Sequence, residues 1–253
     1  YRVGRFTSPH LIDVSERFLI NGAPMPEEAL EDNIGYFRAL ATATGRVPTF
    51  FEMTTAIAFR YFAQERVDVA IIEVGMGGRF DSTNVVVPLA TAITNIDLEH
   101  TAYLGDTLAK IAFEKAGIIK PGVPVVTAEN RPEAFDVFTE RAAAVGAPLF
   151  QLGRDFRAEI SGSPWAQHLR FASGTLRLED VPLSLPGRYQ GDNAAVAAAL
   201  ATQLMGAFPA LGAVQIARGL AKASWPCRLE KVLDSPPVYI DVAHNGAGAR
   251  KLA

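Results

Sequence analysis

The spacing of apolar residues changes along the chain, and each change indicates a different kind of structure. From about residue 49 to residue 148, short apolar runs alternate with longer amphipathic stretches. This alternation is typical of βαβ units, in which helices cover a parallel sheet. We predict strands at 67–74, 90–96 and 123–127, and helices at 54–64, 106–116 and 132–145. The run 67–74 is almost continuously apolar, so we expect a strand that is buried on both faces.

Beyond residue 148 the apolar period becomes two, which predicts antiparallel strands at 156–160, 168–172 and 176–178, with Ser173-Gly174 as a hairpin turn. An alanine-rich run predicts a helix over 190–205, and a second helix covers 213–223. Strands at 229–233 and 238–240 lead into a helix from about residue 247, which we interpret as the crossover of a parallel strand. The predicted fold is a doubly wound, mostly parallel α/β sheet with a small antiparallel appendage and the start of a second α/β domain.

Composition narrows the class of protein. The 24 basic and 27 acidic residues give a net charge of -3, so no general attraction to nucleic acid or to an anionic membrane is expected. The single cysteine, Cys227, excludes an internal disulfide and a CxxC zinc site. No apolar run reaches the roughly 18 residues of a membrane span, and no apolar signal core follows the N-terminus. We therefore expect a cytoplasmic protein, with a monomer as the default state.

Polar residues directly after strands are the first candidates for chemistry, because open parallel sheets bind ligands at the carboxyl ends of their strands. Glu73 ends the first predicted strand and is followed by a loop with glycines at 75, 77 and 78. A carboxylate beside such a loop could hold Mg²⁺, or it could simply end the strand, and both interpretations stay open. The glycines do not form GxGxxG, so the dinucleotide fingerprint is absent.

The next predicted strand ends in a second polar segment, which contains Asp97, Glu99 and His100. Three groups able to bind metal or transfer protons within four residues indicate a site, although a solvated loop would have the same composition. We expect the ends of these two strands to be neighbours. This adjacency favours the metal interpretation.

Other polar residues have simpler interpretations. Lys115 lies near the end of a predicted helix, where a cation is favoured by the helix dipole. Thr49 and Glu52 match a capping box, so we interpret Glu52 as a helix cap rather than a catalytic acid. Arg228 and Asp241, beside the last strands, could contact phosphate or ribose. Cys227 has no histidine beside it in sequence, so a thiol nucleophile is not expected.

Four segments in order along the chain, 6–11, 73–84, 114–118 and 241–245, resemble the folylpolyglutamate synthase and dihydrofolate synthase family. The family is Mur-ligase-like, and the matches extend over almost the whole chain. The resemblance implies ATP-dependent amide formation, in which a folate or dihydropteroate carboxylate is phosphorylated and the amine of L-glutamate then displaces phosphate. It also implies Mg²⁺ and ATP as cofactors.

The resemblance assigns roles to particular residues. It implies Glu73, His100 and Lys115 as metal ligands, with Lys115 carbamylated and both His100 and Lys115 catalytic. For the nucleotide it implies Asn193, Arg228, Asp241 and His244. For the folate or dihydropteroate substrate it implies Ser8, Pro9, His10, Thr49, Phe51, Arg79, Asp81 and Ser82.

The chain also departs from the family pattern. The family has glycine where Cys227 and Val242 stand, proline at Gly246, and usually aspartate where Glu99 precedes His100. The phosphate-binding pattern GxxxxGK[ST] does not occur in this sequence. We therefore expect residues 1–224 to be an ATP-binding domain without its phosphate-loop unit and residues 225–253 to begin a glutamate-ligase domain. The chain alone is not expected to turn over ATP.

Two alternative functions stay open at this point. One is a cell-wall Mur ligase, against which the 8–10 loop and the 73–84 segment argue. The other is a folate-binding or nucleotide-binding relative without catalysis, which the missing phosphate loop suggests and the retained Glu73, His100 and Lys115 oppose.

Overall fold

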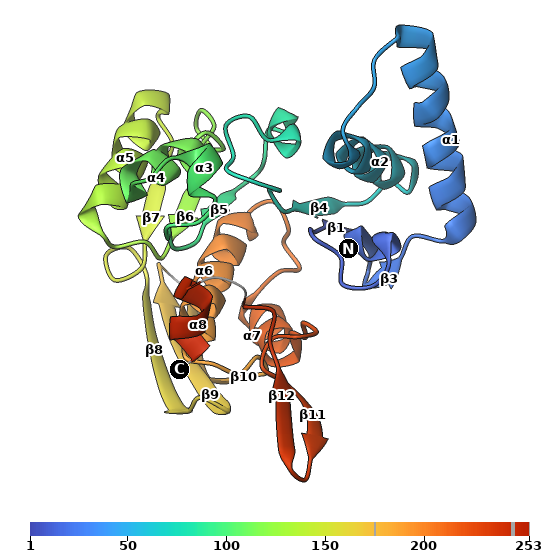
Figure 1. Cartoon of the computed structure of the whole chain (residues 1–253). Helices are drawn as coiled ribbons and strands as arrows, with labels where there is room; N and C mark the ends of the chain where they lie inside the picture. Colours follow the sequence, from blue (N-terminus) through green and yellow to red (C-terminus); the bar gives the residue numbers. More distant parts are fainter. Residues whose placement is uncertain (175, 244–245, 253) are drawn as a thin grey trace. The chain divides into compact units, whose positions relative to one another are not determined.

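The computed structural model describes residues 1–174, 176–243 and 246–252. The chain forms two compact units, Tyr1–Val87 and Pro88–Ala253, which are described separately below (Figure 1). The predicted division into 1–224 and 225–253 stays a prediction.

The first unit is a four-stranded sheet packed against helices. The strand order is β3 (Ala23–Pro24), β2 (Phe18–Ile20), β1 (Val3–Phe6) and β4 (Val69–Ile72), and only the β1–β4 pair is parallel. The one-turn 3-10 helix η1 (Val14–Arg17) precedes β2. Helices α1 (Glu27–Thr44) and α2 (Phe50–Gln64) follow, and the buried side chains of β1, β2 and α2 form one apolar core. Gly4 is required in this core, because a Cβ there would lie 3.0 Å from the Phe62 ring.

The strand predicted at 67–74 is present as β4, but the prediction that both its faces are buried is wrong. Ala70 and Ile71 are exposed, and Ile71 retains 56 % of its accessible surface. The reason is positional, because β4 is at the edge of its sheet and is hydrogen-bonded to β1 alone among the described strands. The continuous apolar run thus predicted the strand correctly but did not predict how far its side chains are buried.

The second unit contains a parallel sheet that is covered on both faces. Its strand order is β5 (Thr91–Ile93), β6 (Val125–Thr127) and β7 (Leu149–Gln151). Helices α3 (Thr101–Leu104) and α4 (Leu108–Ala116) connect β5 to β6, and α5 (Pro132–Val145) connects β6 to β7. Val125 belongs to the core under α4 and α5, whereas Val126 belongs to the core under α6 (Tyr189–Leu204). Both valines are fully buried, which confirms the doubly covered parallel sheet for this part of the chain.

The antiparallel appendage is a three-stranded sheet in the order β10 (Leu176–Leu183), β9 (Ala166–Ser173) and β8 (Arg157–Ser163). Its inward residues, among them Phe171 and Leu169, pack with α6 and α7 (Ala213–Lys222) in the second core. Gly191 on α6 lies against this sheet, where a Cβ would come within 2.5 Å of Ile160. Ser173 pairs with Leu176, so the predicted hairpin is confirmed, although Ser173 belongs to strand β9 and not to the turn.

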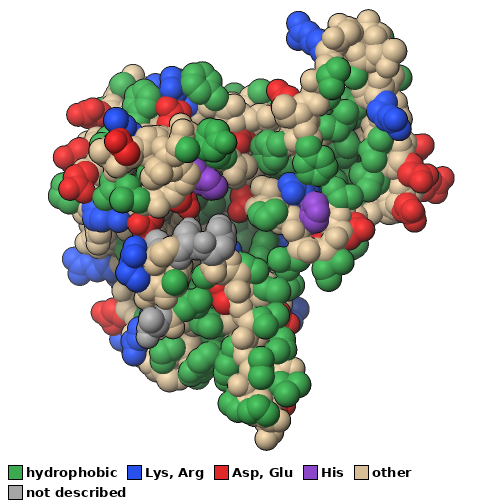
Figure 2. Space-filling model, viewed as in Figure 1, with side chains coloured by type: hydrophobic (Ala, Val, Ile, Leu, Met, Phe, Trp, Pro, Cys, Tyr) green, Lys and Arg blue, Asp and Glu red, His purple; other side chains and the backbone are tan. Residues whose placement is uncertain are grey.

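The last strands, β11 (Glu230–Asp234) and β12 (Pro237–Ile240), pair with each other in antiparallel fashion. The prediction that the final strand is parallel is therefore wrong for the described residues. The hairpin is exposed throughout, and its hydrophobic side chains form a green surface at the bottom of the view in Figure 2. Helix α8 (Gly246–Leu252) ends the described chain. Among the residues that the structure describes, no helix is both long and apolar enough to cross a membrane.

Candidate functional site

In the first unit, the two parallel strands β1 and β4 end side by side and bring Ser8 and Glu73 together. Phe6 pairs with Ile72, and the Glu73 N–H donates to the Phe6 carbonyl at 2.9 Å. The Ser8 N–H then donates to Glu73 Oε2 at 2.7 Å. Two predicted site residues, 65 positions apart, therefore meet at the edge where ligands of parallel sheets bind.

His10 lies in the same loop and is held by a buried arginine that the sequence analysis missed. Arg17 Nε donates to His10 Nδ1 at 2.8 Å, and Arg17 is only 7 % exposed. Because a guanidinium can only donate, Nδ1 must be unprotonated, so a neutral His10 carries its proton on Nε2. Burial lowers the pKa of Arg17, and the Glu73 carboxylate opposes this shift.

Asp81 organises the glycine loop that follows Glu73. Its Oδ2 accepts from the N–H groups of Gly75 and Met76, both at 3.0 Å, and its Oδ1 accepts from Thr83 N at 2.9 Å and Thr83 Oγ1 at 2.6 Å. The Phe51 ring packs against Gly75 so closely that a Cβ there would lie 2.4 Å from it. The predicted residues Phe51 and Asp81 thus shape one loop from two sides.

The remaining substrate residues predicted in this unit have local roles. Thr49 caps α2, with Glu52 N donating to its Oγ1 at 3.2 Å and its own N donating to Glu52 Oε2 at 2.7 Å, so the predicted capping box is confirmed. Arg79 lies over the Phe80 ring at 4.1 Å, and Ser82 opens the 3-10 helix η2 (Ser82–Val85). Pro9 is exposed.

In the second unit, His100 and Lys115 belong to neighbouring segments of polypeptide. His100 precedes α3 with φ at 49°, a left-handed conformation that is uncommon for a residue other than glycine. Lys115, at the end of α4 as predicted, pairs with Glu99 Oε1 at 3.1 Å. Glu99, which directly precedes His100 in the chain, therefore links the His100 segment to Lys115.

The three predicted metal ligands are divided between the two units. Glu73 lies in the first unit, and His100 and Lys115 lie in the second. Strand β4 pairs with β1 in the first unit and β5 pairs with β6 in the second, so the prediction that the ends of β4 and β5 are neighbours stays a prediction. Within the described ranges, no group of three or more His, Cys, Asp or Glu side chains is arranged to hold a metal ion. The shared ligand set therefore stays a prediction.

A pocket of about 270 Å³ lies at the carboxyl ends of β5 and β6 and at the first turn of α6. Polar side chains line most of it, namely Asn95, Asp97, Glu129, Asn130, Arg131, Tyr189, Asp192 and Asn193. The predicted nucleotide residue Asn193 is therefore part of this pocket, and its Nδ2 donates to Gln190 Oε1 at 2.9 Å.

Two more predicted nucleotide residues, Arg228 and Asp241, act electrostatically on Tyr189, which lines the pocket. Burial raises the pKa of the Tyr189 phenol, Asp241 raises it further, and Arg228 acts in the opposite direction. Asp241 also fixes the chain around it, because its Oδ2 accepts from Leu229 N at 3.0 Å and its Oδ1 from Ala243 N at 2.7 Å. His244, the fourth predicted nucleotide residue, lies outside the described residues.

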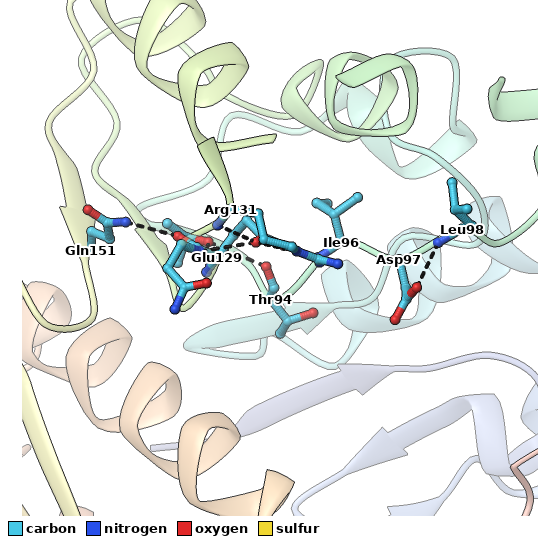
Figure 3. A network of polar contacts seen from close by, with 9 residues as sticks. Thr94, Ile96, Asp97, Leu98, Glu129, Arg131 and Gln151 are labelled. Atoms are coloured by element: carbon cyan, nitrogen blue, oxygen red, sulfur yellow. Dashed lines mark hydrogen bonds and ion pairs between the residues drawn. The ribbon is translucent and has the colours of Figure 1, made fainter. Parts of the chain in front are cut away.

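One carboxylate that lines the pocket was not among the predicted site residues. Glu129, two residues after β6, is 2 % exposed and accepts hydrogen bonds from Ile96 N at 2.6 Å, Asn130 N at 3.0 Å and Arg131 N at 2.9 Å. Its own carbonyl accepts from Gln151 Nε2 at 3.1 Å. Figure 3 shows the Arg131 side chain extending from Glu129 toward the segment of Ile96 and Asp97. Burial alone would raise the pKa of Glu129, but the hydrogen bonds from Arg131 and Ile96 outweigh it and lower that pKa.

Comparison with known proteins shows which family has this arrangement. Residues 28–201 match the Mur ligase middle domain. The chain belongs to the Mur ligase family. This Mur ligase chain is 43 % identical to a dihydrofolate synthase/folylpolyglutamate synthase from Bacillus subtilis, and the match covers 100 % of the chain and 60 % of that protein. The predicted resemblance to the folylpolyglutamate and dihydrofolate synthases is thereby confirmed.

Solved structures agree with this assignment. An FPGS–AMPPCP–folate complex superposes with a TM-score of 0.94 at 38 % identity, over 99 % of this chain and 63 % of that one. A folylpolyglutamate synthase from Mycobacterium tuberculosis, complexed with ADP, superposes with a TM-score of 0.90 at 34 % identity, over 100 % of this chain and 58 % of that one. The Mur ligase chain spans 60 % of the length of the Bacillus subtilis relative and 30 % to 60 % of the length of the other curated relatives that it matches.

Proposed function

We propose that the protein is an ATP-dependent ligase that adds L-glutamate to the carboxylate of folate or dihydropteroate. The observation that carries the proposal is the close similarity, over 99 % of this chain, to a synthase solved with AMPPCP and folate. A carboxylate oxygen attacks the γ-phosphate of ATP, ADP leaves, and the amine of glutamate then displaces phosphate from the acyl phosphate. Each step needs reactants that are held in line and kept from water.

Within this proposal, the loop after β1 and the loop after β4 receive the folate or dihydropteroate. The Ser8–Glu73 hydrogen bond and the four bonds that Asp81 accepts support a pre-formed binding surface. Asn193, Arg228 and Asp241 bind ATP in the second unit, where Asn193 lines the pocket. The cytoplasmic location and the monomeric state predicted from the sequence also belong to the proposal.

Glu73, His100 and carbamylated Lys115 would hold Mg²⁺, which would supply positive charge to the phosphates. The Glu73 carboxylate and a Lys115 carbamate are oxygen donors that suit a hard cation, and the His100 imidazole would be the one nitrogen ligand. Lys115 pairs with Glu99 as an ammonium group. A carbamate has the opposite charge, so it would be stable beside Glu99 only with a cation nearby, which supports a link between carbamylation and metal binding.

The test is phosphate release by the full-length protein from ATP, first with dihydropteroate and then with tetrahydrofolate, each with and without glutamate. Release that depends on both glutamate and a folate substrate is expected, and the preferred substrate distinguishes the two folate activities. Folate binding without phosphate release would instead indicate a non-catalytic relative. Phosphate release with neither folate substrate but with a nucleotide-sugar peptide would favour a cell-wall ligase.

Removal of a metal ligand should stop turnover without unfolding the protein. Glu73→Ala and His100→Ala should each lower glutamate addition by more than about a hundredfold, because the contribution of a metal to transition-state stabilisation is several kcal/mol. Both residues are exposed, so the circular dichroism spectrum should be unchanged. The matched controls are Glu31→Ala on α1 and His168→Ala on β9, which should retain activity. Wild-type turnover in either test variant would remove that residue from the ligand set.

A further inference from the structure

The pocket at the ends of β5 and β6 is built around a charged pair with no role in the proposal so far. We propose that Arg131 is a further nucleoside-binding residue and that buried Glu129 is the positioning residue that holds it in the pocket. This inference rests on the proposed function, because it assigns the nucleoside part of ATP to this pocket.

Glu129 fixes the Arg131 guanidinium through two parallel hydrogen bonds. Arg131 Nε donates to Glu129 Oε1 at 2.9 Å, and Arg131 Nη2 donates to Glu129 Oε2 at 2.7 Å. The same carboxylate accepts three backbone N–H groups, so it cannot turn without breaking several bonds. Such a bidentate pair holds the plane of the guanidinium as well as its position.

Burial distinguishes the two members of the pair. The Glu129 side chain is 1 % exposed, whereas the Arg131 side chain is 38 % exposed and lines the pocket. Arg131 therefore offers a ligand far more surface than the Glu129 carboxylate does. The pair uses the Nε–Nη2 edge, so the Nη1 group and the flat face of the guanidinium point away from Glu129 and are available to a ligand.

The charge of the pocket indicates an uncharged ligand group. Among the described residues that line it, Arg131 is the one basic side chain, against the carboxylates of Asp97, Glu129 and Asp192. This excess of negative charge disfavours phosphate. The amides of Asn95, Asn130 and Asn193 can donate to and accept from the edge of a base, and the exposed carboxylates can accept from ribose hydroxyls. A planar guanidinium also suits the face of an aromatic base.

The experiment measures the affinity of adenosine, which carries the nucleoside without phosphate, by calorimetry or by NMR titration. Arg131→Met should weaken adenosine binding by at least about tenfold, as expected for a lost hydrogen bond to a charged group. The control is Arg170→Met, because Arg170 also pairs with carboxylates, those of Glu159 and Glu179, but is not part of this pocket. It should bind adenosine as the wild type does. Tripolyphosphate should not compete with adenosine.

Adenosine affinity that is unchanged in Arg131→Met would overturn the proposal, and so would competition by tripolyphosphate or an absence of adenosine binding to the wild type. These results are distinct from a failure of the proposed function. Adenosine binding that depends on Arg131, in a protein that does not ligate glutamate, would refute the ligase and keep this inference. Glutamate ligation by the wild type, together with unchanged adenosine affinity in Arg131→Met, would support the ligase and refute this inference.

The positioning role of Glu129 is tested by combining variants. Glu129→Gln should weaken adenosine binding about as much as Arg131→Met does, and the double variant should be no weaker than either single variant. Additive losses would show that Glu129 acts independently of Arg131 and would overturn its positioning role. If Glu129→Gln does not fold, Glu129→Asp gives the same test, because aspartate keeps the charge but is one methylene too short for the bidentate pair and should also lose affinity.

Discussion

At the scale of single residues, several side chains are in conformations or environments that cost free energy. Cys227 has φ at 57°, in the left-handed region where residues with a Cβ are disfavoured. Its backbone is fixed there, because Cys227 N donates to Glu230 Oε2 at 2.8 Å and the Cys227 carbonyl accepts from Val242 N at 3.0 Å. The glycine that we expect at this position from the family resemblance would suit that conformation.

Cys227→Gly should therefore stabilise the protein by about 0.5–1 kcal/mol. Relief of the left-handed conformation gains about 1–2 kcal/mol, and the added freedom of glycine in the unfolded chain offsets part of it. Urea denaturation measures the change. In the control, Ala223→Gly, φ is already -57° and stability should fall instead. A loss of stability in both variants would contradict the argument.

The buried Arg17 makes a second prediction at this scale. His10→Leu removes the acceptor of the Arg17 Nε–H and leaves a buried donor, which should destabilise the protein by about 1–3 kcal/mol. His10→Asn is the matched control, because its amide oxygen can take the place of Nδ1 and accept the same bond. Chemical denaturation of both variants is the measurement, and equal stability would mean that the Arg17–His10 bond contributes nothing.

At the scale of elements, the glycine loop after β4 depends on one carboxylate. The two oxygens of Asp81 accept two hydrogen bonds each, on opposite sides. An asparagine has one carbonyl oxygen and can therefore serve only one of these sides. The loop and η2 cannot both keep their bonds after such a change.

Asp81→Asn should speed amide hydrogen exchange by about tenfold or more at one of two places, either Gly75 and Met76 or Thr83. Exchange followed by NMR distinguishes the two. Asp32→Asn on the exposed face of α1 makes the same chemical change elsewhere and should leave these amides unaffected. Unchanged exchange at all three amides would show that Asp81 does not hold the loop.

Elements with strong apolar periodicity or clear end signals were predictable from the sequence. The helix predicted at 132–145 is α5, and the capping box at Thr49 starts α2 as expected. Helix α1 was not predicted, although Leu30, Ile34 and Phe37 recur at helical spacing and pack, partly buried, against the core of the first unit. Its end signals were present, in Pro26 before the first turn and Gly45 after the last, with Gly45 at φ 64°.

The candidate site was predictable only in part, because some of its contacts join residues that are far apart in the sequence. Ser8, Glu73 and Asn193 follow from strand ends and from family resemblance. Glu129 does not, because its burial depends on Ile96, which is 33 residues away, and a polar residue after a strand otherwise suggests a solvated loop. The rule that led to Glu73, a carboxylate directly beyond a parallel strand, could have selected Glu129 as well.

At the scale of the whole molecule, the two units have different internal organisation. The first has one apolar core, whereas the second has two cores on opposite faces of the β5–β6–β7 sheet. The pocket and the Glu129–Arg131 pair both lie where that sheet ends. The binding geometry of the second unit is thus supported by its most deeply buried strands.

Strand β6 is the element that joins the two cores, because Val125 faces one and Val126 faces the other, both without exposed surface. Neither core can open without exposing part of β6, so the second unit should unfold cooperatively rather than layer by layer. We expect the amides of Val125 and Val126 to exchange with deuterium only through global unfolding of this unit, with the same denaturant dependence as each other. Different exchange behaviour at these neighbouring amides would show that the layers come apart separately. Because the unit is expected to unfold as one, a ligand that contacts Arg131, in the loop directly after β6, should stabilise the whole second unit against unfolding.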